Sequence, residues 1–120
     1  KKDAKRMDRF AQFGVCASIQ AIADAKLEIN ELNADQVGVL IGTGVGGLRV
    51  METQNETLLT KGPKKVSPFT IPMMIANMAA GLTAIHTGAK GPNSCTVTAC
   101  AAGSHAIGDD TSIFCWFLLG

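Results

Sequence analysis

Several features that define whole classes of protein are missing from this chain of 120 residues. Its longest uninterrupted apolar run covers only residues 113–119, whereas a helix that crosses a bilayer needs roughly 20 apolar residues, so we expect no membrane partner. The first residues, KKDAKR, are not followed by an apolar core, so we expect no secretory signal. A net charge of +1 is a poor fit to a dedicated nucleic-acid binder.

Paired metal-ligand motifs are also missing. The four cysteines are Cys16, Cys95, Cys100 and Cys115, and no two of them form a CxxC pair. A structural zinc site is therefore poorly supported, and we expect no metal and no cofactor. Without an export signal, reduced thiols in a cytoplasm or a plastid stroma are the better interpretation.

Charge is scarce in the second half of the chain. Residues 1–65 hold 18 of the 21 charged side chains, and residues 66–120 hold the other three. A half-chain with so few charges cannot cover its own surface with hydrated groups. We therefore expect this half to be the core of something larger or an interface.

The order of apolar and glycine-rich stretches predicts alternating helices and strands, which indicates an α/β layered fold. The helices are expected at 4–26, 48–59 and 73–86, and directly after residue 100. The strands are expected at 37–41 and 95–99, with a loop at 61–72. The glycine-rich turn GTGVGG at 42–47 lacks the spacing and flanking residues of a nucleotide-binding loop, so close backbone packing is its favoured interpretation.

The stretch TACAAGSHAIG carries the strongest chemical signal. It places Cys100 where a strand turns into a helix, and the free amides at a helix N-terminus favour a thiolate and can bind an oxyanion. A buried, inert cysteine is the alternative, and the spacing leaves both open. His105 follows by five residues, about 500° of helical rotation, so it does not face Cys100, and His86 offers no better general base.

Four stretches together resemble one family. They are KRMDRFAQFGV, VGVLIGTGVGGL, KGPKKVSPFTIPMMIANMAAG and GAKGPNSCTVTACAAGSHAIGD. In order and spacing they are similar to the β-ketoacyl-acyl carrier protein synthases, most closely the synthase II type of bacteria and plastids. The resemblance implies the N-terminal half of a thiolase-like α/β/α fold, a homodimer, and a decarboxylating Claisen condensation in fatty-acid elongation with acyl carrier protein as partner.

The resemblance also implies roles for individual residues. Cys100 is the expected nucleophile, Val45 lines the acyl pocket, and Thr70 and Ile71 reach the pocket of a second subunit. A basic patch that receives the acidic carrier protein is expected from Lys2, Lys5, Arg6, Lys64 and Lys65. The two histidines and the lysine that complete the family's chemistry lie downstream of the nucleophile, so the chain alone is expected to be an inactive, truncated fragment.

From Asp110 the sequence departs from the family. Residues 110–120 read DTSIFCWFLLG, where the family continues an amphipathic helix. We therefore expect a family-like unit at 1–109 and a distinct tail at 110–120. Two alternatives stay open: a non-catalytic thiolase-like subunit that contributes a dimer surface, and a cysteine-dependent thioester hydrolase.

Overall fold

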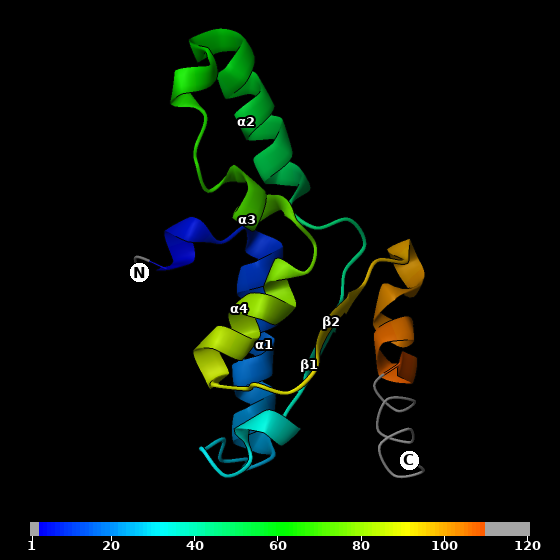
Figure 1. Ribbon diagram of the computed structural model, residues 1–120. Coiled ribbons are helices and arrows are strands. Elements are labelled where there is room, and N and C mark those ends of the chain that lie inside the picture. Colours follow the sequence, from blue (N-terminus) through cyan, green and yellow to red (C-terminus); the bar gives the residue numbers. More distant parts are fainter. Residues whose placement is uncertain (1–2, 110–120) are drawn as a thin grey trace.

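The computed structural model describes residues 3–109 as helices of varied length around two short strands (Figure 1). The α-helices are α1 (Arg9–Asp24), α2 (Leu48–Lys61), α3 (Thr70–Met74) and α4 (Met78–Thr87). The 3-10 helices are η1 (Asp3–Arg6), η2 (Ala34–Gln36), η3 (Pro63–Lys65) and η4 (Ala99–Ala101). The strands are β1 (Val39–Gly42) and β2 (Asn93–Thr96), and residues 102–109 are α-helical.

The two strands are parallel, and helices cover them. β1 pairs with β2 from Val39 opposite Asn93 to Gly42 opposite Thr96. Figure 1 shows α1 and α4 packed together on one side of the strands and the helix at 102–109 on the other. The parallel pair with its helical connection is the arrangement that an alternating α/β pattern predicts.

The core between α1 and α4 is built from small residues and a few large ones. Met7, Ala11 and Ala79 form its buried centre. Phe10, Ile41 and Leu82 pack against this centre while remaining partly exposed. Alanine on the facing surfaces of two helices lets their backbones approach closely, which explains the many alanines of these segments.

The first helix is shorter than the sequence predicted. It begins at Arg9 instead of residue 4, because the Asp8 carboxylate accepts a hydrogen bond from the Arg9 amide at 2.6 Å and caps the helix there. Residues before this cap form the separate 3-10 turn η1. An aspartate just before an apolar stripe was a cap signal that the periodicity alone obscured.

The helix predicted at 73–86 is interrupted. α3 ends at Met74, and Ile75 takes an extended conformation before α4 begins at Met78. The Met74 carbonyl accepts a hydrogen bond from the Gly47 amide at 2.8 Å, so it is engaged by the glycine-rich turn instead of by the next helical turn. The predicted loop at 61–72 likewise contains η3 and the start of α3, where Pro72 is tolerated because it lies in the first turn.

The strand ends differ by one to three residues from their predicted positions, 37–41 and 95–99. The tail expected at 110–120 lies outside the described residues. Within residues 3–109, no helix combines the length and the hydropathy that crossing a membrane requires.

Candidate active site at the Cys100 edge

Both strands end at the same edge of the sheet, and two loops meet there. Gly42 lies opposite Thr96, and the Thr43 amide donates to the Thr96 carbonyl at 3.0 Å. A Cβ on Gly44 would lie 3.9 Å from the Ala99 carbonyl oxygen, so the glycine-rich turn contacts the turn before Cys100. We call residues 42–47 together with 96–102 the Cys100 edge. Ligand sites of parallel α/β sheets form at such carboxyl ends.

Cys100 lies in η4, between the end of β2 and the helix at 102–109, and it is exposed. The hydrogen bonds of this turn are donated by the Ala101 amide to the Thr98 carbonyl and by the Ala102 amide to the Ala99 carbonyl. The Cys100 amide precedes both donors, in the position where a helical amide has no partner within its helix. A nucleophilic sulfur and an amide that can bind an oxyanion therefore belong to one residue.

The helix that follows Cys100 is fixed closely against the strands. The Thr96 hydroxyl donates to the Ala102 carbonyl at 3.0 Å, and both residues are buried. Gly42 faces the same carbonyl, which a side chain at that position would overlap. The strand end, the glycine and the helix start are thus packed without spare space, which holds the Cys100 turn in place.

The residues predicted to line the acyl pocket lie around the same glycine-rich turn. Val45 is at its tip and is 64 % exposed. Thr70 and Ile71 begin α3, whose C-terminal residue Met74 accepts the hydrogen bond from Gly47. Ile71 is 56 % exposed and Thr70 is half-buried. The structure therefore connects these three positions to the Cys100 edge through one turn.

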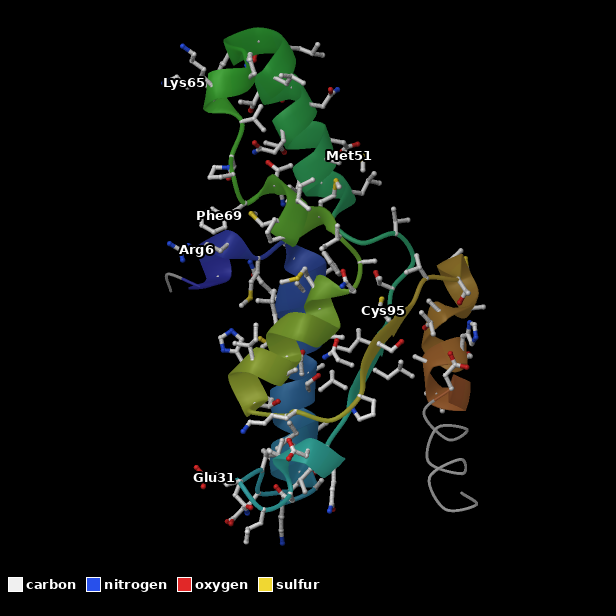
Figure 2. All side chains as sticks on the ribbon, viewed as in Figure 1. Arg6, Glu31, Met51, Lys65, Phe69 and Cys95 are labelled. Atoms are coloured by element: carbon white, nitrogen blue, oxygen red, sulfur yellow. The ribbon has the colours of Figure 1, made fainter. Side chains whose placement is uncertain are left out.

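The predicted basic patch is divided between two places. The guanidinium of Arg6 lies 4.7 Å from the centre of the Phe69 ring, and Figure 2 shows the two side chains together. Lys64 and Lys65 are exposed in η3, and Figure 2 places Lys65 at the far end of α2 from Arg6. Lys2 and the side chain of Lys5 lie outside the described part of the chain.

The other thiols and the histidines have separate surroundings. Burial raises the pKa of the Cys95 thiol, so Cys95 stays protonated to a higher pH than an exposed cysteine. The ring nitrogens of His105 contact Thr98 and Asp109. His86 is exposed near the end of α4. Across residues 3–109, no three His, Cys, Asp or Glu side chains are grouped so that they could hold a metal ion.

The side-chain contacts of Thr96, Thr98 and His105 were missed by sequence reasoning. Residue 98 precedes the 3-10 turn η4, whereas residue 105 lies seven positions later in the α-helix, so no periodic pattern predicts their contact. The sequence offers no more than a threonine near the end of an expected strand as a signal for the bond from Thr96.

Residues 1–112 match the family model described as the N-terminal domain of β-ketoacyl synthases. The chain belongs to the β-ketoacyl synthase family. Over 109 residues it is 75% identical to 3-oxoacyl-[acyl-carrier-protein] synthase 2 of Synechocystis sp. (strain PCC 6803) and 52% identical to the synthase of the same name in Staphylococcus aureus. These alignments cover 91% of this chain but only 26% and 27% of the relatives, so it spans about a quarter of their length.

Solved structures agree with this β-ketoacyl synthase assignment. A type II polyketide synthase acyl-carrier protein in complex with its ketosynthase aligns with a TM-score of 0.81 at 25% identity, over 90% of this chain and 31% of that one. A β-ketoacyl synthase from Burkholderia phymatum aligns with a TM-score of 0.66 at 26% identity, over 90% and 27%. The predicted α/β class and the partial thiolase-like layering are confirmed.

Proposed function

We propose that this chain is the nucleophile-bearing part of a 3-oxoacyl-acyl carrier protein synthase, which condenses an acyl thioester with malonyl-carrier protein during fatty-acid elongation. One observation carries the proposal. Cys100 is exposed in a helical turn at the carboxyl edge of a parallel strand pair, in a chain that is 75% identical to a synthase of this name.

The first half-reaction uses groups that this chain supplies. The Cys100 thiolate attacks the carbonyl carbon of an acyl thioester, and a new S–C bond forms. The negative charge that develops on the carbonyl oxygen is met by the Cys100 amide. When the tetrahedral intermediate collapses, the original S–C bond breaks, the carrier leaves as a thiol after taking up a proton, and the acyl group remains on Cys100.

The second half-reaction needs groups that the 120 residues do not contain. Decarboxylation of the malonyl group generates a carbanion, and its charge must be stabilised as it attacks the acyl thioester. The resemblance assigns this task to two downstream histidines, and neither His86 nor His105, the two histidines present, matches them. We therefore propose that the chain by itself accepts an acyl group but forms no ketoacyl product.

Three further assignments belong to this proposal. Val45, Thr70 and Ile71 would contact the acyl chain, with Thr70 and Ile71 reaching a second subunit of a homodimer; the exposure of Val45 and Ile71 supports this.

Arg6, Lys64 and Lys65 would receive the acidic carrier protein together with Lys2 and Lys5, and the acyl-carrier protein bound to its ketosynthase in the structurally similar complex supports this partner. The place of action would be a bacterial cytoplasm or a plastid stroma.

The test is an acylation assay with the purified chain and an acyl-carrier protein. Intact-protein and peptide mass spectrometry should find one acyl group on Cys100, removable by hydroxylamine. Addition of malonyl-carrier protein should yield no ketoacyl product, since each missing catalytic function costs roughly 10² to 10⁴ in rate.

Two cysteine variants serve as matched controls. Cys100→Ser should abolish thioester formation, whereas Cys16→Ser, on the exposed surface of α1, should leave it unchanged. Acylation that survives in Cys100→Ser would contradict the assignment of the nucleophile. Rapid release of free fatty acid from the acylated chain would instead favour a thioester hydrolase.

A further inference from the structure

Thr98, His105 and Asp109 form a row of polar side chains beside the turn that carries Cys100. The Nδ1 atom of His105 lies 3.2 Å from the Thr98 hydroxyl oxygen. The Nε2 atom of the same ring lies 3.4 Å from the Asp109 carboxylate. Thr98 precedes the turn and His105 follows it, so the contact between them spans Cys100.

The turn that this contact spans is strained. Ala99, directly before Cys100, has a φ of 49°, in the left-handed region that residues with a Cβ rarely adopt. A strained backbone of this kind persists only where the surrounding structure over-determines it. The side of the turn toward β2 is already fixed by the bond from Thr96 to Ala102. On the exposed side, the contact between Thr98 and His105 is the one that spans the turn.

Thr98 contacts the residues after the turn with both its backbone and its side chain. Its carbonyl accepts the Ala101 amide at 3.0 Å, which closes the turn. Its hydroxyl makes no capping bond to η4 and lies instead against His105. If Nε2–H donates to Asp109, Nδ1 is left as an acceptor for the Thr98 hydroxyl, so the carboxylate selects the tautomer that the contact requires.

We propose that Thr98 and His105 are positioning residues, which hold the strained Ala99 turn so that the Cys100 sulfur and the Cys100 amide keep their positions relative to each other. Asp109 orients the His105 ring. The proposal rests on the function proposed above, because it gives Cys100 a geometry that matters for acyl transfer. It concerns orientation alone, and His105 takes no proton from the thiol.

The test measures the alkylation of individual cysteines in the folded chain. Iodoacetamide labelling is followed by peptide mass spectrometry, and the rate at Cys100 is divided by the rate at Cys16, an exposed thiol on α1. Thr98→Val and His105→Leu should each lower this ratio about fivefold, which is the effect of one lost hydrogen bond. The double variant should be no slower than either single variant, because one contact is lost in all three.

Conservative variants distinguish a positioning role from a general loss of structure. Thr98→Ser keeps the hydroxyl, and His105→Asn places an amide near the position of Nδ1, so both should stay within about twofold of the parent ratio. His86→Leu removes the other histidine and should change nothing. Circular dichroism checks that each variant is folded, and if one of the Val and Leu variants is not, the other carries the test against its own conservative counterpart.

The outcomes also separate this proposal from the proposed function. An unchanged Cys100 ratio in Thr98→Val, additive losses in the double variant, or a Ser or Asn variant as slow as Val or Leu would each overturn the positioning role. If the parent chain takes no acyl group from the carrier while the alkylation ratios still respond as predicted, the proposed function fails and the positioning role stands.

Discussion

Two regions of the molecule require glycine for different physical reasons. At the Cys100 edge, Gly42 lies against the Ala102 carbonyl, where a side chain would overlap the backbone. At the end of the α2–η3 arm, which comprises residues 48–65, Gly62 has no neighbouring atom within 4 Å of a Cβ position, but its φ is 79° and its ψ is 170°. One glycine is required by lack of space and the other by backbone conformation.

The two regions also differ in how far their other residues are buried. At the Cys100 edge, Thr96 and Ala102 are buried beside Gly42. On the arm, Leu59 is 77 % exposed, and Lys64 and Lys65 face solvent. The edge therefore fixes the position of a reactive atom, whereas the arm presents side chains to a partner. We expect changes at the edge to alter the whole fold and changes on the arm to act locally.

The largest effect is expected for Gly42→Ala. The new Cβ forces the helix at 102–109 away from β1, and such overpacking costs about 3 kcal/mol in the free energy of unfolding. Urea denaturation followed by circular dichroism measures this loss. Gly103→Ala is the matched control, since Gly103 lies in the same helix with open space around it, and alanine there should be neutral or stabilising. Equal stabilities of the two variants would contradict the close packing.

Gly62→Ala should have a smaller and more local effect. The φ and ψ of Gly62 lie in a region that is nearly exclusive to glycine, so alanine there costs about 1–3 kcal/mol. Because the arm makes few contacts beyond α3, we expect the arm to open while the rest stays folded. Limited proteolysis should cut within residues 58–66 faster than in the parent chain. Unchanged cleavage there, with a loss of overall stability, would show that the arm is part of the core.

Much of the fold could be predicted from the sequence, because its signals are local. The apolar run before GTGVGG predicted β1, and the small residues after Cys100 predicted the helix that follows it. The division of α3 from α4 could not be predicted, because it depends on a hydrogen bond between Gly47 and Met74, which are 27 positions apart. Helical periodicity contains no information about a carbonyl that a distant loop engages.

The candidate site shows the same division between local and distant signals. The position of Cys100 at a turn follows from the neighbouring residues, and the approach of the glycine-rich turn to the turn before Cys100 follows from the parallel strands. The separation of Arg6 from Lys65 depends on the direction in which the arm projects, which no local pattern specifies. The contact between Thr98 and His105 likewise arises only when the Ala99 turn is made.

Thr96→Val tests the Cys100 edge with a side chain of nearly the same volume. The variant removes the hydroxyl that donates to the Ala102 carbonyl at 3.0 Å and leaves that buried carbonyl without this donor, so we expect a loss of about 1–2 kcal/mol in unfolding free energy. Thr96→Ser keeps the donor and should recover more than half of the loss. Thermal unfolding of the three proteins gives the comparison. A valine variant as stable as the parent would mean that the bond does not fix the helix.

The smallest effect on stability is expected for the contact between η1 and the segment that follows η3. Arg6 lies over the Phe69 ring at 4.7 Å, and both side chains are exposed, so the contact is worth only about 0.5 kcal/mol. A double-mutant cycle of Arg6→Gln and Phe69→Leu should give this coupling, measured by urea denaturation. Arg49→Gln, another exposed guanidinium, combined with Phe69→Leu is the control pair and should be additive. A coupling near zero for Arg6 and Phe69 would contradict a stabilising contact, whereas the expected coupling of about 0.5 kcal/mol favours the position over the ring only slightly and leaves Arg6 able to bind a carrier protein.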